Sequence, residues 1–166
     1  MKRQALLVAS AIVVGVAAFV VYRVRVNNAT ALSPRDKEIQ ASLGYESESD
    51  FRSMIGLMNG KIQSMDAAEK ARVHAALSDP KKKVFATLVL GSIVEPSLMR
   101  EFSGDVQQLA NDSKYKSSAA TVLGIWARTA GGREVVADMA RSLNPGVAEI
   151  AKTSLGGMQN GATKGS

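Results

Sequence analysis

The stretch DPKKKVFATLVLG, residues 79–91, decides the fold, because its spacing returns twice farther along the chain. The second copy, DSKYKSSAATVLG, begins at residue 112, and the third, NPGVAEIAKTSLG, begins at residue 144. Counted from its first residue, each copy has Ala at position +7, Leu at +11 and Gly at +12. The starting residues, 79, 112 and 144, lie 33 and then 32 residues apart. A period of this length with helix signals only predicts stacked pairs of helices.

The segments between the copies also have the apolar spacing of helices. One apolar face, at spacings 0, 3, 4 and 7, is formed by Val136, Met139, Ala140 and Leu143. The opposite face carries Arg133, Glu134, Asp138 and Arg141. A second apolar stripe consists of Leu98, Phe102, Val106 and Leu109. It predicts a single helix over residues 96–110 with a weak point at Gly104. Each repeat is therefore expected to be a helical hairpin.

Helix starts also precede the repeats. Three pairs have the spacing of a capping residue and an acidic residue three positions later: Ser33 with Asp36, Ser47 with Asp50, and Asp66 with Glu69. Gly44 and Gly60 are placed to end the first two of these helices. No run alternates apolar and polar residues in the manner of a strand. We therefore expect one all-helical domain over residues 34–157, with a linker at 27–33 and a flexible tail at 158–166.

The first copy carries a family resemblance. The sequence Leu77-Ser78-Asp79-Pro80, followed by Ala86 and then by Leu90-Gly91, resembles a HEAT-like repeat of the short kind found in bilin lyases. The resemblance covers residues 67–157, more than half of the chain. It implies a short α-solenoid of helical hairpins that binds protein partners along its surface. It supplies no catalytic residue for this chain.

The N-terminal region contains an uncharged apolar run, ALLVASAIVVGVAAFVVY, at residues 5–22. The basic residues that flank it are Lys2, Arg3, Arg23 and Arg25. A helix of this length extends about 27 Å, close to the thickness of the hydrocarbon core of a bilayer. The run predicts a transmembrane signal anchor over residues 1–26, in a single-pass membrane protein of a bacterial inner membrane. Two basic residues flank each side, so the positive-inside rule does not decide the orientation. A short N-terminal tail followed by a long C-terminal domain favours a C-terminal domain on the non-cytoplasmic side. The alternative is a signal peptide cleaved after Ala18 or Ala31.

Small residues share one face of this apolar run. They are Ala11, Gly15 and Ala18, spaced four and three residues apart. This spacing predicts a face that packs closely against another membrane helix. The alternative is that the spacing has no role, since small residues are frequent in such segments.

The net charge of +6 is concentrated at the N-terminus. The chain has 21 basic and 15 acidic residues, and four of the basic residues flank the apolar run. The rest of the chain therefore has 17 basic (21 minus 4) and 15 acidic residues. This near balance argues against specific nucleic-acid binding. The absence of cysteine excludes disulfides and thiolate metal sites.

Catalytic chemistry has few candidates in this sequence. His74 is the only histidine, and no Ser, Asp or Glu is placed in the sequence to form a relay with it. Gly131-Gly132 fits a helix junction better than a phosphate-binding loop. Trp126 lies in an apolar helix and is expected in the core. We therefore expect no enzymatic activity, no cofactor and no metal.

Lysines occupy matching positions in the first two copies. They are Lys81, Lys82 and Lys83 at +2 to +4 of the first copy, and Lys114 and Lys116 at +2 and +4 of the second. Equal positions in stacked repeats lie on one ridge, so the five lysines are expected to converge. The ridge predicts binding to an acidic protein or to anionic lipid headgroups. The alternative is a solvated surface with no ligand.

These features predict a membrane-tethered, non-catalytic scaffold or adaptor that binds other proteins. Its partners would be membrane-associated proteins and membrane lipid, without specific nucleic acid, and the sequence leaves the oligomeric state open. One alternative is a single-pass accessory or assembly subunit of a large membrane protein complex. Another is a membrane-linked or secreted enzyme.

Overall fold

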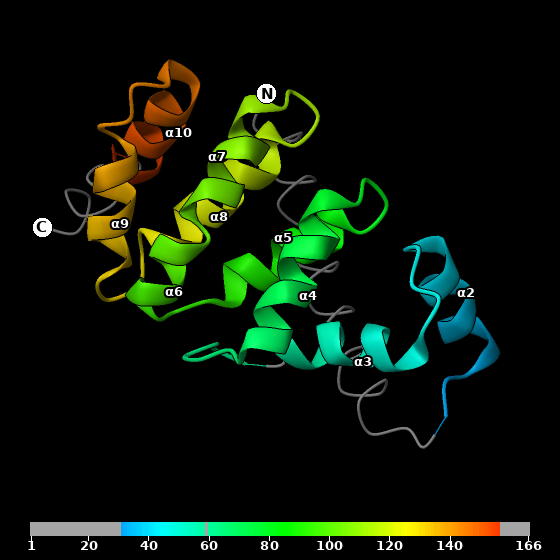
Figure 1. The fold of residues 1–166 in the computed structure, drawn as a ribbon. Coiled ribbons are helices and arrows are strands. Elements are labelled where there is room, and N and C mark those ends of the chain that lie inside the picture. Colours follow the sequence, from blue (N-terminus) through cyan, green and yellow to red (C-terminus); the bar gives the residue numbers. More distant parts are fainter. Residues whose placement is uncertain (1–30, 59, 157–166) are drawn as a thin grey trace, which may run out of the picture. The chain divides into compact units, whose positions relative to one another are not determined.

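The computed structural model describes residues 31–58 and 60–156, which are mostly helical (Figure 1). The chain divides into two compact units, unit 1 at residues 1–59 and unit 2 at residues 60–166. The described residues contain no strand, and their β-structure is limited to an isolated bridge between Ile62 and Ile93. The described parts of both units are built from short helices, and several of these helices start at a side-chain cap.

The described part of unit 1 contains α2 (Pro34–Ser42) and α3 (Glu48–Leu57). Ser33 and Asp36 form a capping box at the start of α2, and the Ser47 side chain caps α3. Gly44, at a φ of 76°, turns the chain after α2, a conformation that glycine adopts without steric cost. The predicted starts of these two helices are therefore confirmed.

Unit 2 consists of helical hairpins. Its helices are α4 (Ala67–Ser78), α5 (Lys83–Ser92), α6 (Pro96–Glu101), α7 (Ser103–Asn111), α8 (Lys116–Trp126), α9 (Gly132–Met139) and α10 (Pro145–Gly156). We call α4, α6, α7 and α9 row A, and α5, α8 and α10 row B. Within row B, α8 packs between α5 and α10, and each helix of this row also packs against row A (Figure 1). This arrangement is compatible with an α-solenoid.

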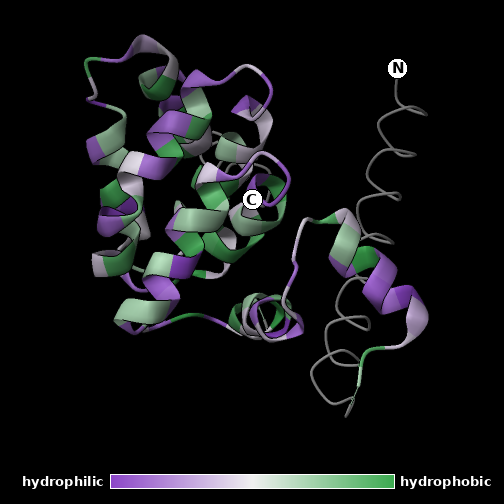
Figure 2. Cartoon of the chain, turned by 45° about the vertical axis from the view of Figure 1, so that its right-hand side comes forward, coloured by the Kyte–Doolittle hydropathy of each residue, from purple (hydrophilic) through white to green (hydrophobic). Residues whose placement is uncertain are grey.

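The matching positions of the three copies explain how the hairpins pack. Ala86, Ala119 and Ala151 at position +7 are fully buried. Leu90 and Leu123 at +11 are also fully buried, whereas the corresponding leucine in the last turn of α10 is partly exposed. Hydrophobic residues line the sides of the helices that face the interior of unit 2 (Figure 2). The repeat is therefore a pattern of core contacts.

The first residue of each copy has the same local role. Its side-chain oxygen accepts a hydrogen bond from the backbone N–H two residues later. The pairs are Asp79 with Lys81 at 2.9 Å, Asp112 with Lys114 at 3.0 Å, and Asn144 with Gly146 at 3.0 Å. This turn satisfies a backbone donor where the chain enters each row B helix.

Side-chain hydrogen bonds also join one repeat to the next. The indole Nε1 of Trp126 donates to the carbonyl of Leu90, 36 residues earlier, at 2.8 Å. Asn144 Nδ2 donates to Asn111 Oδ1, 33 residues earlier, at 2.7 Å. Because these separations approximate the repeat length, each bond links equivalent parts of adjacent hairpins.

Two details of the helices differ from the prediction. The helix expected over residues 96–110 is interrupted at Phe102 (φ −86°, ψ 1°), and not at the weak point expected at Gly104. Phe102 is fully buried, whereas Gly104 is exposed with open space around it. The helix therefore breaks at a packed core residue and not at the glycine. Leu143 is fully exposed, because α9 ends at Met139 and leaves Leu143 beyond the helical face that buries Val136.

The transmembrane part of the expected fold class requires correction. Over residues 31–58 and 60–156, no helix is long and apolar enough to span a bilayer. The longest, α4 and α10, have 12 residues each, or roughly 18 Å, against about 30 Å of hydrocarbon. The segment 5–22, on which the expected anchor rested, lies outside the described residues. The same finding argues against the expected single-pass location in a bacterial inner membrane.

Candidate functional site

Two of the predicted ridge lysines converge on one aromatic ring. The Nζ atoms of Lys83 and Lys114 lie 4.9 Å and 5.3 Å from the centroid of the Tyr115 ring, in cation–π contact. Tyr115 is buried, and its hydroxyl donates to the carbonyl of Pro80 at 3.3 Å. Tyr115 therefore joins the starts of the first two copies and contacts a lysine from each.

The other three lysines have different surroundings. Lys82 lies 3.4 Å from Asp79 Oδ2, and Lys116 lies 3.6 Å from Glu149 Oε2 in the third copy. Lys81 is exposed. Within the described ranges, Lys81, Lys83 and Lys114 form no ion pair with a carboxylate, and we call these three residues the lysine cluster.

The turn before α5 also affects the ionisation of Asp79. The hydrogen bond from the Lys81 backbone N–H is the main cause that holds the pKa of Asp79 below its ordinary value of 3.8. Partial desolvation opposes this effect, and the Lys82 side chain adds to it. The carboxylate that turns the chain into row B is therefore stabilised in its charged form.

Row A has a different electrostatic character, because its charged groups pair across helices. Lys70 of α4 lies 2.7 Å from Glu101 of α6, and Arg100 of α6 lies 3.9 Å from Glu134 of α9. Such pairs neutralise the face locally. Lys81, Lys83 and Lys114, at the N-terminal ends of the first two row B helices, have no such carboxylate partner among the described residues, and neither do Arg128, Arg133 and Lys152 elsewhere in unit 2.

His74 has a partner that the sequence did not reveal. Its Nδ1 lies 3.1 Å from Asp105 Oδ2, and its ring stacks on Phe102 with centroids 4.5 Å apart. Asp105 is 31 residues farther along the chain, so only the repeat length could have indicated the pair. Among the described residues, no group of three or more His, Cys, Asp or Glu side chains could hold a metal. The contact between His74 and Asp105 joins α4 and α7.

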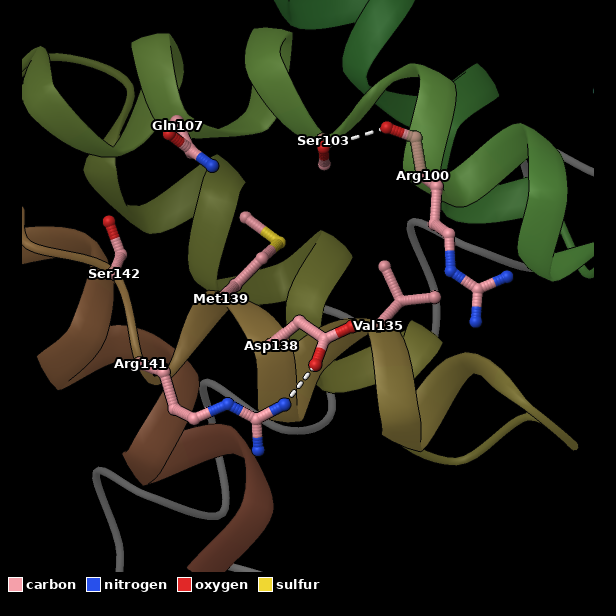
Figure 3. A pocket seen from close by; sticks show the side chains of 8 residues that line it. All are labelled: Arg100, Ser103, Gln107, Val135, Asp138, Met139, Arg141 and Ser142. Atoms are coloured by element: carbon pink, nitrogen blue, oxygen red, sulfur yellow. Dashed lines mark hydrogen bonds and ion pairs between the residues drawn. The ribbon is translucent and has the colours of Figure 1, made fainter.

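A shallow pocket of about 290 Å³ lies between α6–α7 and α9 (Figure 3). Its lining residues are Arg100, Ser103, Gln107, Val135, Asp138, Met139, Arg141 and Ser142. The Ser103 hydroxyl donates to the Arg100 carbonyl at 2.7 Å, and Asp138 pairs with Arg141 (Figure 3). Each of these two interactions joins residues three positions apart in the sequence, so neither crosses the pocket from α6–α7 to α9.

The remaining predicted residues fall into three places. Ala11, Gly15 and Ala18 lie outside the described residues. Gly131 and Gly132 form the junction between α8 and α9, as expected. Trp126 is fully buried in the core, also as expected.

Comparison with known proteins gave no relative: no protein-family model, no curated protein and no solved structure matches this chain.

Proposed function

We propose that unit 2 is a non-catalytic protein-binding module, a scaffold or adaptor of the kind that HEAT-like repeats form. The observation that supports this function is the hydrogen bonding between equivalent parts of adjacent hairpins, as in Trp126 with Leu90 and Asn144 with Asn111. These bonds hold the exposed helix faces in a fixed arrangement before any partner binds. A preformed surface loses little conformational entropy on binding, which favours affinity.

The lysine cluster gives this surface a preference among partners. Positive charge that is not neutralised within the protein attracts acidic surfaces and accelerates their association. The cluster lies at the starts of α5 and α8, which pack side by side, so one partner would contact both repeats. The binding of an acidic protein along row B is therefore the function that this geometry supports best.

Site-specific photocrosslinking in the cells that produce the protein tests this proposal. A photoreactive benzoylphenylalanine would replace exposed Thr121 on α8, with exposed Ala71 on α4 as the row A control. We expect Thr121 to yield a discrete protein adduct heavier than the 17.5 kDa chain. The adduct should disappear when Lys81, Lys83 and Lys114 are all changed to Glu. No protein adduct from either position would contradict the proposed function.

A further inference from the structure

The outward face of row B differs among the three copies. Positions +5 and +9 are Ser117 and Thr121 in α8 and Glu149 and Thr153 in α10, and these four polar residues are exposed. Ser117 and Thr121 lie on the solvent-exposed side of α8, which packs between α5 and α10. In α5 the same positions hold Val84 and Leu88, which are 53% and 45% exposed. The first copy thus presents apolar side chains where the others present polar ones.

A third apolar side chain extends this face. Gly91 lies three residues after Leu88, on the same side of α5. The Cδ1 atom of Ile125 in α8 lies 3.1 Å from the point that a Cβ of residue 91 would occupy. Ile125 is itself 38% exposed, so it continues the apolar surface where α5 lacks a side chain. Val84, Leu88 and Ile125 form an apolar strip along α5, about 10 Å long at the helical rise.

The apolar strip begins beside the lysine cluster. Lys81 lies in the turn that precedes α5, three residues before Val84, and Lys83 directly precedes Val84. Lys114 reaches the same end of α5, since it shares the Tyr115 ring with Lys83. One end of the strip is therefore cationic.

We propose that the apolar strip and the lysine cluster together dock an acidic amphipathic segment of a partner protein. Apolar side chains of the segment, three or four residues apart, would cover Val84, Leu88 and Ile125, and its carboxylates would contact the lysine cluster. Charge complementarity selects this occupant over a second copy of the chain, whose own row B end is also cationic. This inference rests on the proposed protein-binding function and specifies the chemistry of the partner.

Peptide display against the full-length protein tests the docking surface. A random library of short peptides would be selected on the protein, and Kd values of the enriched peptides would be measured by fluorescence anisotropy. The matched variant Val84→Ser/Leu88→Thr carries the residues that the second copy has at the same positions, so the helix should be retained. We expect enriched peptides to combine Asp or Glu with helically spaced apolar residues, and to bind this variant about tenfold more weakly or worse.

Two further variants separate the apolar and charged contributions. Ile125→Ser introduces the residue that the first copy has at the equivalent position, Ser92, and should also weaken binding. Lys81→Gln/Lys83→Gln/Lys114→Gln should remove most of the salt dependence of Kd between about 50 and 500 mM NaCl. Circular dichroism would verify that each variant is folded.

The possible outcomes distinguish this inference from the proposed function. Enriched peptides that bind the Val84→Ser/Leu88→Thr and Ile125→Ser variants as tightly as the original protein would overturn the docking surface and leave a protein-binding module in place. Binding to phosphatidylglycerol vesicles that these variants abolish, with no enriched acidic peptide, would overturn the inference in favour of a lipid ligand. No enriched peptide together with no photocrosslinked protein would overturn both.

Discussion

Two glycines of unit 2 should respond in opposite directions to the same added methyl group. Gly132 begins α9 and is buried, and a Cβ there would lie 2.3 Å from the Trp126 carbonyl oxygen and from Thr129 Oγ1. It would also lie 2.9 Å from Met99 Sδ. The Thr129 hydroxyl can rotate only by giving up its 2.8 Å hydrogen bond to Trp126, and the carbonyl cannot rotate away. Gly132→Ala therefore forces α9 to shift away from α6 and α8.

The magnitude follows from these contacts. Overpacking of a core costs about 1–3 kcal/mol, and loss of the threonine hydrogen bond adds about 1 kcal/mol. We expect Gly132→Ala to lower the free energy of unfolding by about 2–4 kcal/mol. Each kcal/mol lowers the Tm of a domain of this size by roughly 4–8 °C. The melting temperature should therefore fall by roughly 10 °C or more.

Gly124 is the matched control. It lies inside α8, and a Cβ there would meet nothing within 4 Å. Alanine has a higher helix propensity than glycine, so Gly124→Ala should stabilise unit 2 by about 1 kcal/mol. Thermal unfolding followed by far-ultraviolet circular dichroism measures both variants. A Gly132→Ala protein that melts at or above the temperature of the original protein would refute the close approach of α9 to α6 and α8.

Three further predictions concern other parts of unit 2. Trp126→Phe removes the indole donor to Leu90, and should lower the free energy of unfolding in urea by about 1–3 kcal/mol; an unchanged value would argue against this link between repeats. Asp79→Ala should lower the Tm above pH 3.8. The difference from the original protein should vanish as the pH falls through the depressed pKa of Asp79, because protonation of Asp79 in the original protein removes the same interaction. A difference independent of pH would contradict that assignment. Leu143→Ser should change the free energy of unfolding by less than about 0.5 kcal/mol, because Leu143 is fully exposed. A larger loss in urea unfolding would show that Leu143 is buried in the core.

Sequence reasoning succeeded where the signal is local. The capping pairs that begin with Ser33, Ser47 and Asp66 each start a helix as predicted, because the hydrogen bonds involved span only three residues. The spacing of the three copies likewise predicted hairpins, since the same positions point into the core in each copy. Ala86 and Ala119, at position +7 of their copies, are both fully buried, as the spacing predicts.

Sequence reasoning failed where contacts between helices decide the outcome. The break at Phe102 accompanies the packing of a buried ring against His74, which no local pattern encodes. The exposure of Leu143 depends on where α9 ends. The expected transmembrane helix relied on the apolar run and its basic flanks, and no described helix is long and apolar enough to span a bilayer. For the candidate site, the two lysines that meet on Tyr115 occupy unequal positions, +4 for Lys83 and +2 for Lys114, so the rule of equal positions did not predict this pair.

Methyl NMR of the full-length protein would show directly whether a partner binds along row B. Isoleucine, leucine and valine methyl groups would be labelled, and an enriched acidic peptide would be titrated into the protein. We predict that the chemical shifts of Val84, Leu88 and Ile125 change, while that of Val135, in the pocket between α6–α7 and α9, stays constant. Changes centred on Val135, with the apolar strip unaffected, would contradict the assignment of partner binding to row B.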